Sequence, residues 1–402
     1  MLLSGFWPLK ISQGQWIYSR NFGDLQMLLR MISCAPKWRS SIYQLDLPNG
    51  CGGYTYGYYF ARALGALGVN DTLSGFFGFS FLLFVLLSLG LLANFLLRNS
   101  NLSVSLVFLA CISPGVWLAI IHGSLDILIF LLVCLAFFLY KSGKDYSALF
   151  LISIATLAKF FTLPLLIFLT YKTFIQAKNN FVRLLILLSS FTISLSTFSD
   201  IQRVPWNDSG YRLANGIFNV FGVDTLYNWV KVISFKYFRR ELLFSPAIGK
   251  IVSGLIFLIL LLVTAVILFR RGNLLNHGNR PGKIIQSNYA RMGFIFFSLP
   301  FLTLYFQGAN WDNKLLFAIP SGLFLLAFTP ELKAKTFLTW IYFLGLWFSC
   351  FWPKSFPQIS FVLIQMLGDL SISLFAAALV AVLIHHFVDT ATNVRLTKPK
   401  ST

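Results

Sequence analysis

Acidic residues are scarce in this chain, and charge of either sign is sparse. Asp and Glu number 13 against 32 Lys and Arg in 402 residues, and all charged residues together make up 11% of the chain. A soluble domain of this length carries about a quarter charged residues. Hydrophobic residues reach 57%. This composition excludes the soluble, disordered and fibrous classes and predicts a polytopic membrane protein built as one membrane domain.

Several familiar motifs are also missing. The five cysteines include no Cys-x-x-Cys pair, which excludes the common zinc and redox motifs. No nucleotide-binding loop, metalloprotease helix, Ser/His/Asp set or EF-hand occurs. The formal charge of +19 is spread over short loops, so it indicates membrane topology and contact with the lipid bilayer. We therefore expect no nucleic-acid partner and no metal-ligand cluster.

Apolar runs dominate residues 73–388, the predicted transmembrane domain. A membrane span needs roughly 17–25 residues, and several of these runs are shorter and must include aromatic or amide flanks. The predicted fold is an all-α polytopic membrane protein with nine transmembrane helices. The predicted spans are Leu73–Leu97, Leu102–Ile121, Leu125–Tyr140, Phe181–Phe198, Ile251–Phe269, Met292–Phe306, Leu315–Phe328, Phe337–Trp352 and Leu370–Val388.

One further apolar run, Tyr146–Tyr171, is interrupted by Lys159 and Pro164. Proline removes a backbone donor and disfavours helix in the residue before it. The pattern therefore predicts two half-helices that form a re-entrant hairpin, entering and leaving the membrane on the same side.

The basic residues predict the orientation of the chain. The linker Arg270–Arg291 holds five basic residues and no acid, which is typical of a cytoplasmic segment. Alternating outward from it places residues 1–72 and the loop 200–250 outside, and the basic tail 389–402 inside. The loop 200–250 mixes aromatic and basic residues, which favours helices lying in the membrane interface. We expect a multi-pass protein of the inner (plasma) membrane whose active face lies outside the cytoplasm.

An outside N-terminus without a preceding helix is unusual. Met1–Leu9 has neither the basic start nor the cleavage site of a signal peptide. The pattern predicts either a further helix upstream of Met1 or an N-terminal segment that lies in the interface without crossing.

Asp24 is the first candidate for chemistry, since it precedes a short apolar run in the outer segment 1–72. One interpretation is an N-cap, for which Asp is favoured. The other is a general base for an acceptor hydroxyl, or a ligand that holds a divalent cation against a phosphate. The two roles are compatible.

Asp126 and Lys159 are charges at or inside apolar runs. Such residues are rare and face the protein interior or a water-filled cavity. For Asp126 the alternative to a functional role is an acid at the cap or first turn of a helix, where it matches the helix dipole. For Lys159 the alternatives are a snorkelling side chain at the hairpin turn and a counter-charge for a buried acid or a lipid phosphate.

A second polar island at the outer surface is Gln307–Pro320, which contains Asp312 and Lys314. Lys314 stands where its ammonium could pair with a phosphate, since Lys is a common phosphate-binding point charge. The alternative is an ordinary loop in which Asp312 caps the following helix.

Short motifs spread over most of the chain resemble the GT-C superfamily of integral-membrane glycosyltransferases, with the closest likeness to bacterial members that use polyprenyl-phosphate sugars. Lys314 stands where that superfamily often has Arg. The matching pieces are Gly23-Asp24, Ser41-Ile42-Tyr43, Cys51 to Gly57, Gly123 to Asp126, Ala158 to Pro164, and Asn310 to Pro320.

The resemblance implies an inverting transfer of a sugar from a polyprenyl phosphate to a lipid or glycan acceptor at the outer face. Asp24 would act as the base, with Asp126 as the second catalytic candidate. The one cofactor candidate is a divalent cation. The donor phosphate would face Lys314, Arg62 and Lys159, and the other outer-face candidates are Asp312, Tyr43 and Tyr56.

Two other functions remain open. A transporter or flippase of lipid-linked sugars would also hold polyprenyl phosphates, but such proteins often have broken helices at matching positions in two halves, and here only one broken run occurs. A membrane scaffold without chemistry would tolerate replacement of all the candidate residues.

Overall fold

The computed structural model describes residues 23–34, 58–203, 220–223, 225, 227, 229, 246–269, 281–307, 310–329, 332–349 and 359–396. Within these residues the protein consists of helices joined by short turns, together with two two-residue strands. The strands are β1 (Val220–Phe221) and β2 (Asn310–Trp311), and they pair antiparallel, with Val220 opposite Trp311 and Phe221 opposite Asn310. The expected all-α class is confirmed for this part of the chain.

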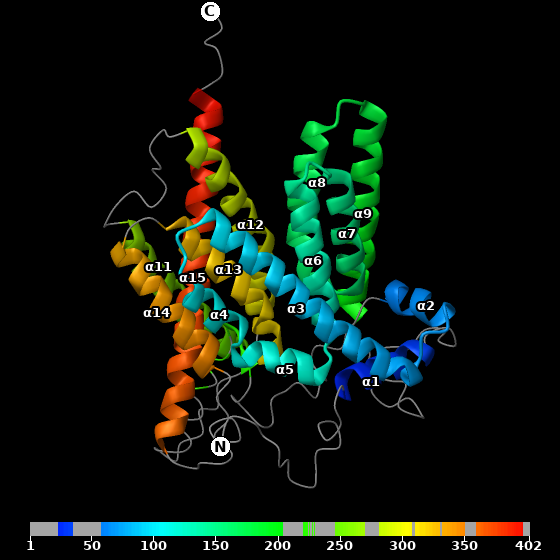
Figure 1. The fold of residues 1–402 in the computed structure, drawn as a ribbon, viewed down its shortest axis with the longest axis horizontal. Helices are drawn as coiled ribbons and strands as arrows, with labels where there is room; N and C mark the ends of the chain where they lie inside the picture. Colours follow the sequence, from blue (N-terminus) through cyan, green and yellow to red (C-terminus); the bar gives the residue numbers. More distant parts are fainter. Residues whose placement is uncertain are drawn as a thin grey trace, which may run out of the picture.

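The helices are named in chain order in Figure 1. They are α1 (Gly23–Cys34), α2 (Tyr58–Ala66), η3 (Asp71–Leu73), α3 (Ser74–Asn99), α4 (Val104–Cys111), α5 (Pro114–His122), α6 (Leu125–Lys141), α7 (Asp145–Ala158), η4 (Phe160–Thr162), α8 (Leu163–Gln176), α9 (Asn180–Arg203), α11 (Pro246–Phe269), α12 (Pro281–Phe306), η5 (Asp312–Phe317), α13 (Ala318–Phe328), α14 (Leu332–Phe348) and α15 (Ile359–Leu396).

Five of the described segments are long and apolar enough to cross a membrane. They lie in α3, α9, α11, α12 and α15. Large apolar side chains of α3, α9 and α11 are mostly exposed, whereas the span in α15 is mostly buried. Because exposed Phe and Leu in such numbers need an apolar solvent, we assign the exposed faces of α3, α9 and α11 to lipid. The protein is therefore a helical membrane protein in which α15 is the most buried of the five long apolar segments.

The helices form two groups. Helices α6, α7, α8 and α9 stand together on one side, and α11 to α15 stand together on the other (Figure 1). Helix α3 crosses diagonally between the groups and packs on α6 and α13 (Figure 1). Helix α5 lies across one end of the bundle, which we call the α5 end. The opposite end carries the α6–α7 and α8–α9 connections, and we call it the α8–α9 end.

The predicted span Leu102–Ile121 is wrong as a single helix. The chain ends α4 at Cys111 and starts α5 at Pro114, with Ser113 extended at φ −60° and ψ 152°. Pro114 explains the break, because proline drives the preceding residue out of the helical region and is itself favoured in the first turn of a helix. The turn lets α5 lie across the bundle instead of continuing along it (Figure 1).

The break predicted within Tyr146–Tyr171 is present. Helix α7 ends at Ala158, Lys159 is extended at φ −160° and ψ 127°, and η4 and α8 follow. Pro164 lies in the first turn of α8, where its missing N–H costs no helical hydrogen bond. Helices α7 and α8 pack against each other as the two arms of a hairpin.

Three predicted boundaries are also corrected. Helix α15 begins at Ile359, well before the predicted start of the last span at Leu370, and Asp369 lies inside the helix. Helix α12 begins at Pro281, within the basic linker. Helix α9 continues through Asp200 to Arg203, so the predicted outer loop starts later. Helix ends are poorly marked where polar residues are tolerated inside an amphipathic segment.

Phenylalanine rings fill the space between the two ends of the bundle. Phe161, Phe130, Phe137, Phe297 and Phe317 are fully buried and Phe95 is nearly so. Ring centroids lie 5.1 to 6.2 Å apart along the series, a favourable range for aromatic pairs. We call this series the phenylalanine chain; it runs in the order Phe161, Phe317, Phe130, Phe297, Phe137 and Phe95.

Candidate functional site

Asp126 is held inside the α5 end by a tight turn between α5 and α6. Gly123 ends α5 in the left-handed conformation at φ 60°, which glycine adopts without steric cost. Ser124 then caps α6, since its Oγ accepts the backbone N–H of Asp126 at 3.3 Å. Asp126 falls in the first turn of α6, and its side chain is 1% exposed. Of the two alternatives for its local role, the first-turn acid is therefore correct and the N-cap is Ser124.

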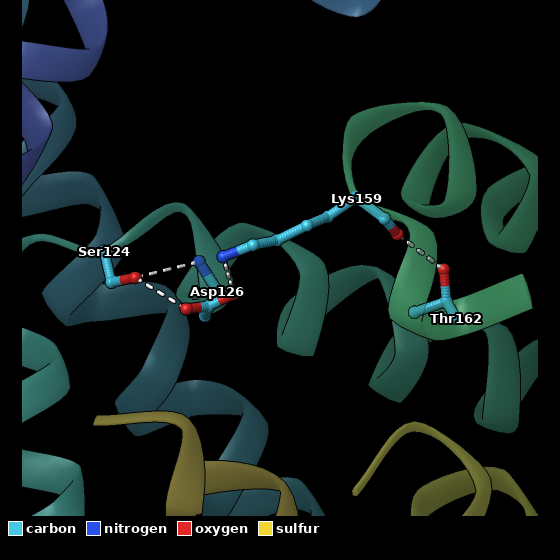
Figure 2. A network of polar contacts seen from close by, with 4 residues as sticks. All are labelled: Ser124, Asp126, Lys159 and Thr162. Carbon is cyan, nitrogen blue, oxygen red and sulfur yellow. Dashed lines mark hydrogen bonds and ion pairs between the residues drawn. The ribbon is translucent and has the colours of Figure 1, made fainter. Parts of the chain in front are cut away.

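Lys159 reaches Asp126 from the break between α7 and η4 (Figure 2). Its Nζ lies 2.7 Å from Asp126 Oδ1, and the lysine side chain is only 11% exposed. The other carboxylate oxygen, Oδ2, accepts the Ser124 hydroxyl at 2.9 Å. The lysine is thus the counter-charge of a buried acid, and both carboxylate oxygens of Asp126 are engaged.

Two threonines stabilise the break that carries Lys159. Thr162 Oγ1 donates to the Lys159 carbonyl at 3.3 Å, which satisfies a backbone acceptor at the point where the helix stops (Figure 2). Thr156 Oγ1 lies 3.0 Å from Thr162 Oγ1 and also bonds to the Ile152 carbonyl at 2.8 Å. These bonds fix the direction in which the Lys159 side chain leaves the backbone.

Lys314 is the third charge at this site. It lies in η5, and its ammonium is close enough to act electrostatically on both Asp126 and Lys159. The three residues that follow it, Leu315 to Phe317, are fully buried and hold η5 against α5 and α12. Chain segments distant in sequence therefore bring two lysines and one carboxylate together, and we call Asp126, Lys159 and Lys314 the charged cluster.

The charged cluster combines two basic side chains with one buried carboxylate. Removing charges from water is costly, and a buried ion pair offsets that cost only with good geometry and further hydrogen bonds, which Ser124 supplies here. The two lysines make this end of the bundle a candidate for contact with an anion.

The other predicted site residues are only partly placed. Asp24 lies in the first turn of α1 and not at its cap, because the helix already includes Gly23; its side chain is outside the described residues. Helix α1 packs against α5 and α3, which brings Asp24's helix to the α5 end. Arg62 is exposed on α2, which packs on α7. The side chain of Asp312 and the whole of Tyr43 and Tyr56 fall outside the described residues.

Two parts of the site were missed by sequence reasoning. Ser124 precedes Asp126 by two residues, and a Ser just before an apolar run is a cap signature that could have predicted this bond. The second part is Asp369, which is 1% exposed within α15 and accepts the indole N–H of Trp229 at 2.6 Å. The sequence signal that could have identified Asp369 is the presence of an acid inside the last apolar run.

No cation site is apparent in the described residues. No three His, Cys, Asp or Glu side chains gather within that part of the chain. A divalent cation held by Asp24 stays a prediction, because the side chain of Asp24 is not among the described groups.

Comparison with known proteins identifies no relative. No protein-family model matches the chain, and no curated protein and no solved structure is significantly similar to it.

Proposed function

We propose that this protein is a membrane glycosyltransferase that moves a sugar from a polyprenyl-phosphate donor to an acceptor at the outer membrane face. The observation that supports this most directly is the charged cluster, with two lysines around one buried carboxylate. A sugar–polyprenyl phosphate is a phosphodiester anion, and two lysines at one buried carboxylate suit such an anion. Lysine ammonium groups are common partners for phosphate oxygens.

The roles of the residues follow from their contacts. Lys314 and Lys159 face the donor phosphate and stabilise the charge that grows on it as the sugar leaves. Asp126 positions Lys159, since both of its carboxylate oxygens are already hydrogen-bonded within the protein. Asp24, on a helix that packs against α5, takes the proton of the acceptor hydroxyl as general base. Arg62, Asp312, Tyr43 and Tyr56 contribute to the outer-face surface around donor and acceptor.

The membrane arrangement in this proposal has nine transmembrane segments and one hairpin. The segments are α3, the broken pair α4–α5, α6, α9, α11, α12, α13, α14 and α15, and the hairpin is α7–η4–α8. The chain is oriented with its α8–α9 end in the cytoplasm, in an inner (plasma) membrane. Supporting this orientation, basic residues gather at that end and have no carboxylate partner among the described residues: Arg98, Lys141, Lys144, Lys172 and Arg183.

Topology is tested by tagging. An epitope placed in the linker 270–280 is expected to be inaccessible in intact cells and accessible after permeabilisation, because positively charged linkers are retained in the cytoplasm. A tag at 353–358 is expected to be accessible in intact cells. Antibody labelling of the 270–280 tag in intact cells would reverse the orientation and remove the charged cluster from the outer face.

Activity is tested through the lysine of η5. We expect Lys314→Ala to lower transfer of labelled sugar from a polyprenyl phosphate by about 100-fold, which is the usual cost of removing one charge-stabilising group. Lys314→Arg should keep part of the activity, because it keeps the charge but changes its geometry. Asp24→Asn should abolish transfer, because it removes the proposed general base. Rates are measured in isolated membranes and normalised to the amount of folded protein.

A matched control is Lys333→Ala, because Lys333 is exposed at the start of α14. Wild-type transfer rates in the Lys314→Ala and Asp24→Asn variants would contradict the proposed function. A flippase, which the broken helix at Lys159 also suits, would instead move the intact lipid-linked sugar across vesicles without transferring it.

A further inference from the structure

The last long helix contains a buried acid away from the charged cluster. Asp369 lies within the apolar segment Leu363–Val388 of α15 and is 1% exposed. Its Oδ2 accepts the indole N–H of Trp229, which is itself 3% exposed, at 2.6 Å. Ionisable residues inside an apolar span are costly and are kept mainly for function. The two residues are far apart in sequence, so this bond ties the segment after β1 to the centre of the bundle.

The acceptor side of this bond is rigid. The neighbouring Gly368 lets α15 approach the backbone of Phe348, the last residue of α14, and of Ser349 so closely that no larger residue fits. Ser373 Oγ donates to the Asp369 carbonyl at 2.8 Å. Helix α15 also packs on α11 and α12. Asp369 is therefore a fixed point of the scaffold.

The donor side connects to β1 through a short segment. Val223, Thr225, Tyr227 and Trp229 are helical, and the Thr225 N–H donates to the Gly222 carbonyl at 3.1 Å. The Tyr227 ring covers Gly249 on α11, at a spot where a Cβ atom would collide with it. Trp229 follows Phe221 by only eight positions in the sequence. Between them, Tyr227 contacts α11 at Gly249, and Trp229 itself bonds to α15 at Asp369.

Strand β1 in turn contacts the segment that carries Lys314. Phe221 pairs with Asn310, and β2 continues without a gap into η5, where Lys314 is the third residue. We propose that the Trp229–Asp369 hydrogen bond is an anchor that fixes the β1–β2 pair and, through it, the position of Lys314 in the charged cluster. Asp369 and Trp229 are positioning residues. Their effect on sugar transfer rests on the proposed function, whereas their effect on the β1–β2 pair does not.

The expected effect is a displacement and not unfolding. Leu315, Leu316 and Phe317 are fully buried, so we expect η5 to keep its hydrophobic contacts when the anchor is removed. What the anchor controls is the strand that precedes η5. Loss of a hydrogen bond to a carboxylate is expected to shift the equilibrium between the paired and the displaced strand by about tenfold or more.

The anchor is tested first without reference to activity. In a background with the native cysteines replaced, Phe221→Cys and Asn310→Cys are joined by a short thiol-specific cross-linker in native membranes. Trp229→Phe, which removes the indole N–H and keeps an aromatic ring, is expected to lower the initial cross-linking rate about tenfold. Asp369→Leu should have the same effect. Asp369→Asn should be milder, since its amide oxygen still accepts the indole N–H.

Trp340→Phe is the matched control, because Trp340 is 64% exposed on α14. Its cross-linking rate should equal that of the parent protein. Unchanged rates in both Trp229→Phe and Asp369→Leu, at normal amounts of folded protein, overturn the proposal.

The second readout is sugar transfer, measured on the same variants without the cysteine pair. A displaced Lys314 should raise KM for the polyprenyl-phosphate donor and lower kcat, with partial rescue in Asp369→Asn. If cross-linking falls as expected but the wild-type protein transfers no sugar, the anchor stands and the glycosyltransferase proposal fails. If the wild type transfers sugar and the anchor variants match it in both readouts, only the anchor fails.

Discussion

Replacing Asp126 with Asn is expected to destabilise the protein by about 3–5 kcal/mol, more than replacing Lys159 with Met. The Asn variant removes the buried carboxylate that acts on both Lys159 and Lys314 and leaves the two lysines close together. The Met variant leaves Asp126 with Lys314, which still acts on it. The charges that remain in each variant therefore make Asp126→Asn more destabilising than Lys159→Met. If the Asp126–Lys159 ion pair were the sole contribution, the two variants would lose the same stability.

The measurement is the free energy of unfolding in mixed micelles with increasing SDS, read by tryptophan fluorescence. The double variant Asp126→Asn/Lys159→Met should be more stable than the sum of the two single effects predicts, because each single change also leaves an unbalanced charge. Lys333→Met, at an exposed position on α14, should change the free energy by less than about 0.5 kcal/mol. Equal losses in the two single variants would show that Lys314 does not contribute to the cluster.

Replacing Gly368 with Ala is the second change with a large expected effect, about 3 kcal/mol of lost stability. A Cβ atom at this position would overlap the backbone nitrogen of Ser349 and the backbone carbonyl carbon of Phe348. Backbone atoms inside a helix cannot move aside as a side chain can, so α14 and α15 must separate. Small residues at helix crossings serve this close approach in membrane proteins.

The same unfolding measurement tests this expectation. Gly254→Ala on α11 is the matched control, since a Cβ atom there meets nothing within 4 Å. It should be neutral or stabilising by about 0.5–1 kcal/mol, which is the helix-propensity gain of Ala over Gly. Because Gly368 adjoins Asp369, the Ala variant should also slow the cross-linking of residues 221 and 310. An unchanged stability in Gly368→Ala would show that the two helices are not in close contact.

Local signals in the sequence predicted part of the fold correctly. The break at Lys159 and Pro164 was predictable because a charge and a proline both oppose an apolar helix, and the hairpin arms α7 and α8 lie on either side of it. The break at Ser113 was missed, although Pro114 carries the same signal, because the surrounding run is apolar enough to count as one span. Hydropathy alone does not separate a straight span from two angled helices.

The charged cluster shows what sequence reasoning cannot supply. Asp126, Lys159 and Lys314 were each selected as charges in or beside apolar runs, which is a local property. That they meet depends on how α6, the α7–η4 break and η5 pack, and no periodicity encodes such contacts. The same holds for Trp229 and Asp369, whose hydrogen bond joins segments with no local relation.

The phenylalanine chain has a consequence for how the site is reached. It runs from Phe161 and Phe317, next to Lys159 and Lys314, to Phe95, over which the Lys141 ammonium lies at 4.3 Å. A column of close-packed rings has no polar group to hydrate an ion and no gap for a water file. Small hydrophilic reagents should therefore modify Lys314 from one compartment alone, and in the proposed reaction the released phosphate would leave by the entrance it used.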